Sequence, residues 1–394
     1  MNKNILDTGA QDFINKHLDT DIISVILKKS PFQKISPQEL AEQIQAKKKC
    51  IKKLPIWFDT PNIYYPNRLN IEQCSSEATA KYKASILSGE TLVDLTGGFG
   101  VDTYFFSKRV DRVFHCEINK DLSGIAAHNL GTLGVGNIDF IPKDGLGFLK
   151  DSCQRFDWLY IDPSRRSENK GKVFLLSDCT PNTIEHLPLL FQKSKHIMIK
   201  TSPLLDITSG LNQLRHVKEI HVVALKNEVK ELLWVLEEGY GGETNVKALN
   251  LIEPKPQLYD FDLSEEKNTS PTYELPLDYL YEPNAALLKA GAFKILSKAF
   301  KVDKLHGHSH LFTSKDLMEF PGRVFKIKKV TGYNKKEIKD LVGSQANITV
   351  RNFPESVATI RKKHKIKDGG EVYLFFTRLK NDQLAIIKAS KVVP

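Results

Sequence analysis

Residues 219–237, EIHVVALKNEVKELLWVLE, decide the topology of the chain because they hold two apolar runs with almost nothing between them. The runs, 219–225 and 231–237, are rich in the aliphatic and aromatic residues typical of strands. Only Lys226 to Lys230 separate them, whereas a crossover between parallel strands needs about a dozen residues or more. The two strands are therefore expected to form an antiparallel hairpin.

Five more strands are predicted upstream, at 91–96, 112–117, 137–142, 157–162 and 196–201. The stretches between them are long enough for crossover helices, so these strands are expected to be parallel with right-handed connections. The fold class is thus α/β, with a doubly wound, Rossmann-like sheet whose last strand is antiparallel. This is the architecture of class I methyltransferases.

The regions on either side of this sheet differ from it in pattern. The N-terminal region is predicted to be helical, with IISVILK (22–28) inside a longer helix and a capping box at Ser36–Glu39 that opens a helix to about Lys48. Residues 240–275 are rich in breakers and charges and read as a boundary. A helix in 282–300 with short strands around 301–305 and 310–314, and a small α+β module at the C-terminus, complete the chain.

We expect four domains from these patterns. They are a helical region at 1–71, the sheet domain at 72–240, a linker with a small module at 241–322 and a basic α+β domain at 323–394.

The excess positive charge lies at one end of the chain. The net charge is +10, and the last 72 residues alone hold 17 Lys and Arg against six Asp and Glu, a net +11. A segregated basic domain is typical of proteins that bind phosphate backbones, which favours a nucleic-acid partner. No signal peptide or membrane span is evident, and the five cysteines are scattered, so we expect a cytoplasmic protein with reduced thiols and no metal cluster.

A glycine-rich turn, DLTGGFG (94–100), ends the first predicted strand and opens a helix. Such turns bind nucleotide-like ligands, nicotinamide cofactors among them. Three features favour S-adenosylmethionine (SAM) instead. Asp94 can contact the cationic methionine end of SAM. Thr103 stands where a nicotinamide enzyme has its third glycine, which the cofactor's pyrophosphate needs and SAM does not. Glu117 ends the second strand, where it can accept hydrogen bonds from the ribose hydroxyls of the cofactor. Asp144, after the third strand, can accept from the adenine amine.

These motifs resemble those of class I SAM-dependent methyltransferases. Thr96 replaces the first glycine of the usual motif, and the variant that ends at Asp102 is similar to that of a bacterial ribosomal-RNA guanine methyltransferase. The stretches at 72–84, 281–293 and 352–375 resemble one bacterial family with a ferredoxin-like module and a THUMP-like C-terminal domain. The resemblance implies SAM as cofactor, contacted by Asp94, Thr96, Gly98, Gly100, Asp102, Glu117 and Asp144. THUMP domains bind RNA, which agrees with the basic C-terminus.

The stretch IDPSRR (161–166) resembles the fourth motif of amine-methylating enzymes, in which an acid and the following carbonyl hold an exocyclic amine. Asp162 and Pro163 fit that arrangement, but Arg165 stands where an aromatic ring is usual, so we expect Arg165 to stack on a base or hold a phosphate. A carbon-5 uracil enzyme would need a cysteine after strand five, where Lys200 to Pro203 offer none.

The sequence therefore predicts a SAM-dependent methyltransferase that acts on a nucleobase amine in ribosomal or transfer RNA. We expect RNA to be its partner, and neither association with a membrane nor an obligate protein partner. Arg166 and four residues near the C-terminus, Arg361, Lys362, Lys363 and Lys365, are the predicted RNA contacts. Two alternatives stay open: methylation of a protein or small molecule, and an RNA-binding protein with weak or no turnover. His306, His308 and His310 would share one face if their segment is extended, which leaves a metal site open.

Overall fold

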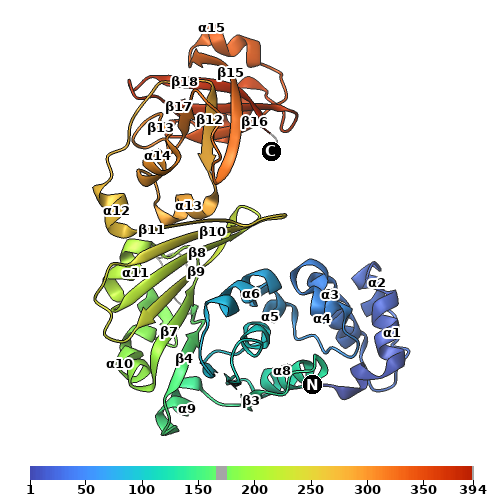
Figure 1. Cartoon of the computed structure of the whole chain (residues 1–394). Helices are drawn as coiled ribbons and strands as arrows, with labels where there is room; N and C mark the ends of the chain where they lie inside the picture. Colours follow the sequence, from blue (N-terminus) through green and yellow to red (C-terminus); the bar gives the residue numbers. More distant parts are fainter. Residues whose placement is uncertain (166–174, 393–394) are drawn as a thin grey trace. The chain divides into compact units, whose positions relative to one another are not determined.

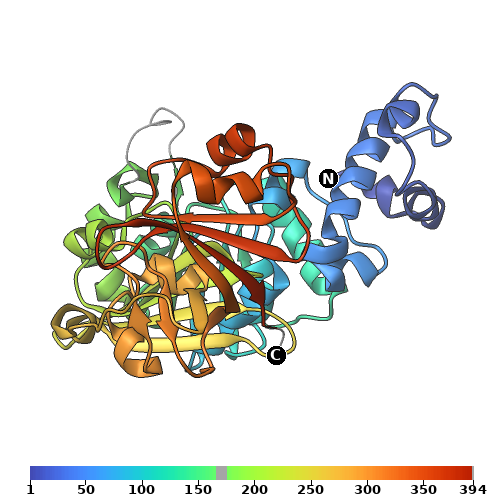
Figure 2. The same cartoon turned by 90° about the horizontal axis from the view of Figure 1, so that it is seen from above.

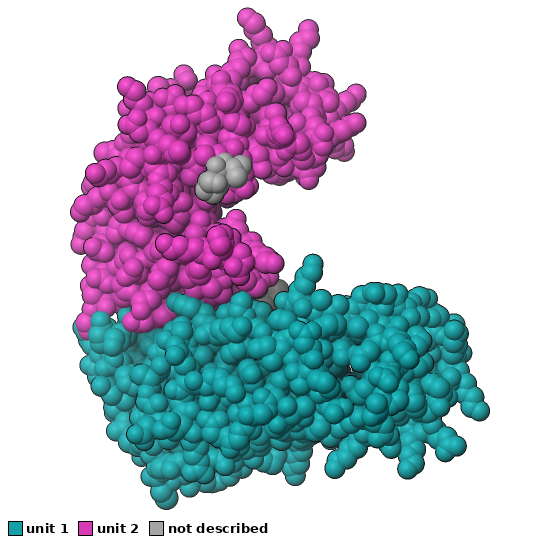
Figure 3. Space-filling model, turned by 45° about the vertical axis from the view of Figure 1, so that its right-hand side comes forward, with its two compact units in different colours: residues 1–218, 233–241 teal, residues 219–232, 242–394 magenta. Residues whose placement is uncertain are grey.

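The computed structural model describes residues 1–165 and 175–392. In these residues the strands form a nine-stranded sheet, a seven-stranded sheet and a two-stranded ribbon (Figure 1). Two compact units divide the chain, residues 1–218 with 233–241 and residues 219–232 with 242–394 (Figure 3). Within the described ranges, we find no helix with the length and apolar character that crossing a bilayer requires.

Six α-helices precede the first strand. They are α1 (Thr8–Lys16), α2 (Ile22–Ile26), α3 (Pro37–Lys53), α4 (Pro55–Asp59), α5 (Arg68–Gln73) and α6 (Glu77–Ile86). The predicted capping box is confirmed, since Ser36 Oγ accepts from the Glu39 amide and Glu39 Oε2 accepts from the Ser36 amide. The longer helix expected around 22–28 is wrong: α2 ends at Ile26, and Pro31 has no amide with which a helix could continue.

All seven predicted strands of the main sheet are present. They are β1 (Thr91–Asp94), β2 (Arg112–Cys116), β3 (Ile138–Ile141), β4 (Phe156–Ile161), β7 (Ser194–Thr201), β8 (Val217–Leu225) and β9 (Glu228–Glu237). Their order in the sheet is β3-β2-β1-β4-β7-β9-β8, and the first five are paired in parallel. The class I methyltransferase architecture is thereby confirmed, with the last strand inserted beside the fifth.

The β8–β9 connection is even shorter than predicted. Lys226 and Asn227 alone form it, with φ of 52° and 66°. Two consecutive residues in the left-handed region make the type I′ turn that closes tight antiparallel hairpins. The hairpin inferred from the spacing is therefore correct.

Two strands that the sequence analysis did not predict extend this sheet beyond β8. The strand β10 (Asn245–Leu251) pairs in parallel with β8, and β11 (Gln257–Asp262) pairs antiparallel with β10. Gly239 and Gly241 precede β10, and Pro254 and Pro256 lie between the strands. These breakers made the segment look like a boundary, whereas they mark turns between strands.

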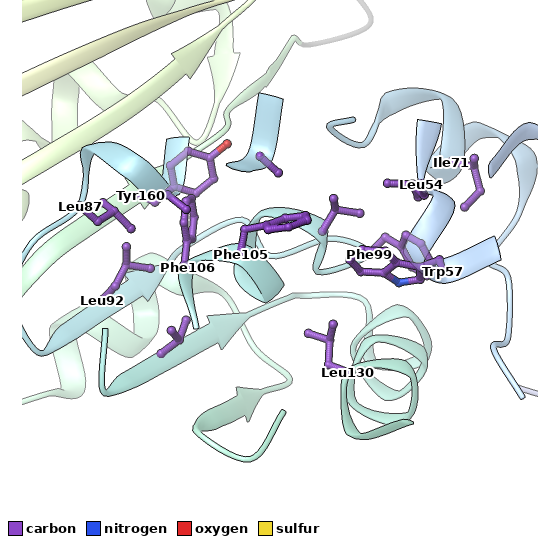
Figure 4. Close-up of a cluster of buried hydrophobic side chains, with 14 of the residues drawn as sticks. Leu54, Trp57, Ile71, Leu87, Leu92, Phe99, Phe105, Phe106, Leu130 and Tyr160 are labelled. Carbon is purple, nitrogen blue, oxygen red and sulfur yellow. The ribbon is translucent and has the colours of Figure 1, made fainter. Parts of the chain in front are cut away.

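The helices α7 (Val101–Phe106), α8 (Lys120–Thr132), α9 (Gly145–Asp151), α10 (Thr183–Lys193) and α11 (Ile207–Gln213) follow strands of the main sheet. A large apolar cluster joins the N-terminal helices to this sheet domain (Figure 4). In it, fully buried Trp57 lies near Phe99, and the rings of Phe106 and Tyr160 meet edge to face at 4.9 Å. The N-terminal helices thus share a core with the elements that carry the glycine-rich turn.

The seven-stranded sheet lies wholly in the second unit. Its strands are β12 (Tyr279–Pro283), β13 (Asp303–Lys304), β14 (Phe312–Ser314), β15 (Gly322–Gly332), β16 (Asn347–Arg351), β17 (Val372–Arg378) and β18 (Leu384–Lys391), in the order β13-β14-β12-β15-β18-β17-β16. Because β12 pairs with β15, the module at 241–322 and the basic domain share one sheet. In Figure 2 the helices α15 (Lys335–Ile338) and α16 (Val357–His364) lie on one side of the red strands.

The helices of this unit are α12 (Leu263–Asn268), α13 (Ala285–Ala290), α14 (Ile295–Phe300), α15 (Lys335–Ile338) and α16 (Val357–His364). The single helix expected in 282–300 is wrong, because Gly291, at φ 77°, ends α13 before α14 begins. Phe375 and Phe376 are buried, and Phe353 packs against the apolar cluster that contains Phe376.

The three histidines that raised the question of a metal lie in a turn between β13 and β14, not on an extended strand. His310 stacks on Phe293 at 3.7 Å, whereas His306 bonds Asn352. Among the described residues no cluster of three metal-ligating side chains forms.

Candidate active site

A cavity of about 730 Å³ opens where the carboxyl ends of the parallel strands meet, as expected for ligand sites in such sheets. It lies within the first unit. Every predicted cofactor-binding residue lines it, as does the predicted amine-orienting acid: Asp94, Thr96, Gly98, Gly100, Asp102, Glu117, Asp144 and Asp162. The fold therefore brings together residues that are up to 68 positions apart in the sequence.

The glycine-rich turn is shaped by close packing. Gly98 and Gly100 adopt φ of 55° and 83°, which L side chains rarely adopt. A Cβ at Gly97 would lie 2.3 Å from Nε2 of the buried His115. A side chain at Gly97 would therefore collide with His115, and the turn presents only backbone atoms at its three glycines.

Asp94 ends β1 and is almost fully buried. Its Oδ1 accepts from the Thr96 amide at 3.1 Å and its Oδ2 from the Thr103 hydroxyl at 2.7 Å. Burial raises the pKa of Asp94 to about 7, even though these hydrogen bonds act in the opposite direction. The carboxyl group is therefore poised to ionise when a cation approaches.

Asp102, in the first turn of α7, belongs to a buried network. Its Oδ2 accepts from Ser75 at 2.8 Å and from the Tyr160 hydroxyl at 3.0 Å, and the fully buried Lys83 ammonium lies 3.2 Å from its Oδ1. Burial alone would raise the Asp102 pKa, but Lys83 and then Lys200 hold it below its usual value. The network braces the floor of the cavity with an ionised carboxylate.

Glu117 and Asp144 stand at the ends of the second and third strands. Both oxygens of Glu117 accept from backbone amides, Oε2 from Gly98 at 2.9 Å and Oε1 from Asn119 at 2.7 Å. Asp144 caps α9 by accepting from the Gly147 amide at 2.7 Å. These bonds fix both carboxylates, and each oxygen keeps a lone pair for a further donor.

Asp162 follows β4 at the edge of the cavity. Its amide donates to Thr96 Oγ1 at 2.7 Å, so the glycine-rich turn and the DP motif hold each other in place. Its Oδ2 forms an ion pair with Lys200 at the end of β7. Pro163 is buried behind it, and Ser164–Arg165 form the short strand β5, which pairs with β6 (Cys179–Thr180).

Lys200 lines the cavity beside Asp162 but was not among the residues predicted for the site. The signal was present: β4 and β7 pair in parallel with Ile161 opposite Ile199, so the next residue of each strand faces its neighbour. The predicted role of Arg165 stays a prediction, because only its backbone is described, and Arg166 lies outside the described residues.

Two thiols, Cys74 and Cys116, line the cavity. Burial raises the pKa of Cys74 to about 11 and raises that of Cys116 further. Both are protonated at neutral pH, so neither meets the need of a carbon-5 enzyme for a thiolate nucleophile.

The predicted RNA contacts of the basic domain fall into two groups. Arg361 is bound to its own domain, through Asp368 and the Ala346 carbonyl, and Lys363 pairs with Glu355 at 2.8 Å. Lys362 and Lys365, at the end of α16, are exposed. The second pair is better placed to meet an external phosphate.

The parallel sheet, its inserted last strand and the carboxylate-lined cavity define a class I methyltransferase fold. The whole chain is similar to a candidate methyltransferase from Porphyromonas gingivalis W83, whose crystal structure matches with a TM-score of 0.89 at 30% identity over 99% of both chains. Residues 279–321 match a ferredoxin-like domain and residues 322–389 match a THUMP domain-like family. The chain belongs to this methyltransferase family, as its motifs indicated.

Two more distant relatives are informative. An uncharacterized S-adenosylmethionine-dependent methyltransferase of Mycobacterium tuberculosis is 21% identical over 325 residues, which cover 81% of this chain and 86% of that protein. An uncharacterized RNA methyltransferase of Mycoplasma mobile is 28% identical over 98 residues, 25% of this chain and 27% of that protein.

Proposed function

We propose that this protein is a SAM-dependent methyltransferase that modifies an exocyclic amine of a nucleobase in RNA, ribosomal or transfer. The observation that carries the proposal is one cavity lined both by the strand-end carboxylates Asp94, Glu117 and Asp144 and by the DP motif at Asp162. The M. tuberculosis relative is named as SAM-dependent, which supports the same cofactor here.

The residues present fit SAM. The glycine-rich turn at 97–100 would let a nucleoside approach the backbone, Glu117 would accept from the ribose hydroxyls, and Asp144 would accept from the adenine amine. The buried Asp94 matches the cationic methionine end, because ionisation of a carboxyl with a pKa near 7 is easily driven by a cation. Bound SAM would supply an electrophilic methyl group.

The chain's own contribution to catalysis is alignment. Asp162 can accept a hydrogen bond from the amine through Oδ1, while Thr96 fixes its backbone and Lys200 fixes Oδ2. Because binding already holds the nucleophile in line with the methyl group, the transfer step does not have to lose the translational and rotational entropy of a bimolecular encounter. After transfer the amine must lose a proton, and the Asp162 carboxylate is the neighbouring acceptor.

RNA as the substrate class rests on the second unit. The THUMP domain-like match, residues 322–389, covers most of the basic segment 323–394, whose net charge is +11. Lys362 and Lys365 are exposed on it. The M. mobile relative is named as an RNA methyltransferase, which supports the same class.

The direct test is nucleoside mass spectrometry of ribosomal and transfer RNA from cells with and without the gene. We expect one N-methylated nucleoside to vanish from the deletion strain and to return with the wild-type gene. The purified Asp162→Ala variant should lose roughly 100- to 1000-fold in kcat with SAM affinity largely kept. Unchanged RNA nucleosides, with a labelled protein or metabolite instead, would contradict RNA as the substrate.

A further inference from the structure

Lys200 stands out among the described residues that line the cavity, because it is the one Lys or Arg among five carboxylates. Its side chain is only 14% exposed, and that of Asp162 is 34% exposed. The register of β4 and β7 places the two side by side, so their pairing is built into the sheet. A cation placed this firmly against the amine-orienting acid has a role that the motif itself does not assign.

The pair presents two complementary hydrogen-bonding groups next to each other. Lys200 pairs with Oδ2 of the cavity-lining Asp162, so the second carboxylate oxygen, Oδ1, can accept a hydrogen bond from a ligand. An ammonium has three donors and no acceptor, so Lys200 can donate to an acceptor on a ligand as well as to Asp162. A ligand edge that fits must therefore offer a donor and, beside it, an acceptor.

We propose that Lys200 is a specificity-determining residue that selects bases carrying an amidine unit, an amine next to an unprotonated ring nitrogen. The amine would donate to Asp162 Oδ1 and the ring nitrogen would accept from Lys200 Nζ. Adenine offers N6 with N1, cytosine offers N4 with N3, and guanine offers N2 with N3. Uracil is excluded because it has no amine. The N2–N1 edge of guanine is also excluded, because its N1–H is a donor and would face the donors of the ammonium. The inference rests on the proposed function and narrows it.

The test replaces the ring nitrogen by carbon. A synthetic RNA oligonucleotide spanning the methylated position carries either the natural base or its deaza analogue (1-deazaadenine, 3-deazacytosine or 3-deazaguanine, according to the base identified). For the wild type, the deaza base should lower kcat/KM by roughly 5- to 150-fold, the discrimination of one good base contact. For Lys200→Met, which is slower on the natural base, the deaza penalty should shrink to less than about twofold, because the contact is already lost.

Controls separate this role from a structural one. Lys200→Arg keeps a donor and should retain most of the deaza penalty, and Lys81→Met, an exposed lysine on α6, should behave as wild type. Calorimetry with S-adenosylhomocysteine (SAH) should give all three variants wild-type cofactor affinity within about twofold. Deaza substitution changes the intrinsic reactivity of the amine equally for every variant, so it cancels in the comparison.

Two kinds of failure are distinguishable. If the wild type methylates no RNA nucleoside, the proposed function fails and the inference falls with it. If the wild type methylates an RNA base but shows no deaza penalty, or Lys200→Met shows the full penalty, only the role of Lys200 is overturned. The role of Lys200 would also be overturned if the methylated base were uracil, or if it were guanine bound through its N2 and N1–H edge.

Discussion

The carboxylates of the cavity are chemically distinct although all end a strand or open a helix. Asp94 is buried against neutral donors and its pKa is raised to about 7, whereas Asp102 is buried against Lys83 and its pKa is lowered. Asp102 is thus ionised whether or not a ligand is bound and contributes a fixed negative charge to the cavity, whereas Asp94 becomes an anion when a cation binds. Sequence motifs locate both residues but do not separate these roles.

Asp94 makes cofactor binding pH-dependent with a predictable sign. Below pH 7 the carboxyl is mostly protonated and offers no charge to a cationic ligand end; above pH 7 it is mostly ionised. We therefore expect SAH affinity to rise roughly tenfold from pH 6 to pH 8, measured by calorimetry. In Asp94→Asn the dependence should flatten, and the ratio of the two proteins cancels the titration of the ligand itself. Equal slopes in both proteins would refute this role.

At the scale of elements, the spacing of apolar runs was enough to predict seven of the nine strands of the main sheet. The seven strands and the hairpin followed from run lengths and from the short Lys226–Asn227 connection. The misses were local. The strands β10 and β11 are bracketed by glycines and prolines that look like linker, and Gly291 splits one amphipathic run into α13 and α14. The strands β10 and β11 form because β10 pairs with β8 and β11 pairs with β10, and such pairing does not show in a sequence pattern.

The candidate site was predictable to a similar degree. The strand-end acids were found because parallel strands bring their carboxyl ends together, and all of them line one cavity. Lys200 was not predicted for the site because its position beside Asp162 depends on register, the pairing of Ile161 with Ile199. The network of Ser75 and Lys83 around Asp102 was likewise hidden, since it joins α6 to α7 in space.

The junction of α9 with β1 gives a sharp packing prediction. A Cβ at Gly145 would lie 2.4 Å from the Leu95 carbonyl oxygen, and backbone cannot move aside as a side chain can. We expect Gly145→Ala to destabilise the fold by about 1–3 kcal/mol and to weaken SAH binding at least tenfold. In Gly124→Ala, on an exposed part of α8 with open space around it, stability should rise by about 0.5–1 kcal/mol. Thermal melts that rank the two variants the other way would contradict the packing.

At the scale of the molecule, the shared seven-stranded sheet changes how the basic domain can be tested. Removing residues 323–394 would strip β15 from β12 and expose Leu280, Leu305 and Leu311, which are buried in one apolar cluster with Phe325. Loss of RNA binding after such a truncation would therefore report misfolding as readily as lost contacts. Substitutions at exposed lysines avoid this problem.

Lys362 and Lys365 are the residues to replace. If both contact phosphates, Lys362→Gln with Lys365→Gln should weaken RNA binding and reduce the slope of log affinity against log salt by about 1.4–1.8. Fluorescence anisotropy with the cognate RNA at several salt concentrations measures the slope. The matched pair Lys28→Gln with Lys29→Gln, exposed lysines of the N-terminal region, should leave the slope unchanged. An unchanged slope in the first variant would remove α16 from the RNA interface.

The cavity at the strand ends must bind SAM if this chain is to methylate any substrate. Isothermal titration of the full chain with SAH tests this most directly, with Glu117→Ala as the matched variant because Glu117 touches the cavity without belonging to the buried core. We predict saturable binding at one SAH per chain, weakened at least tenfold by the substitution. Absence of saturable heat in the folded wild-type protein, or equal affinity in the variant, would contradict it.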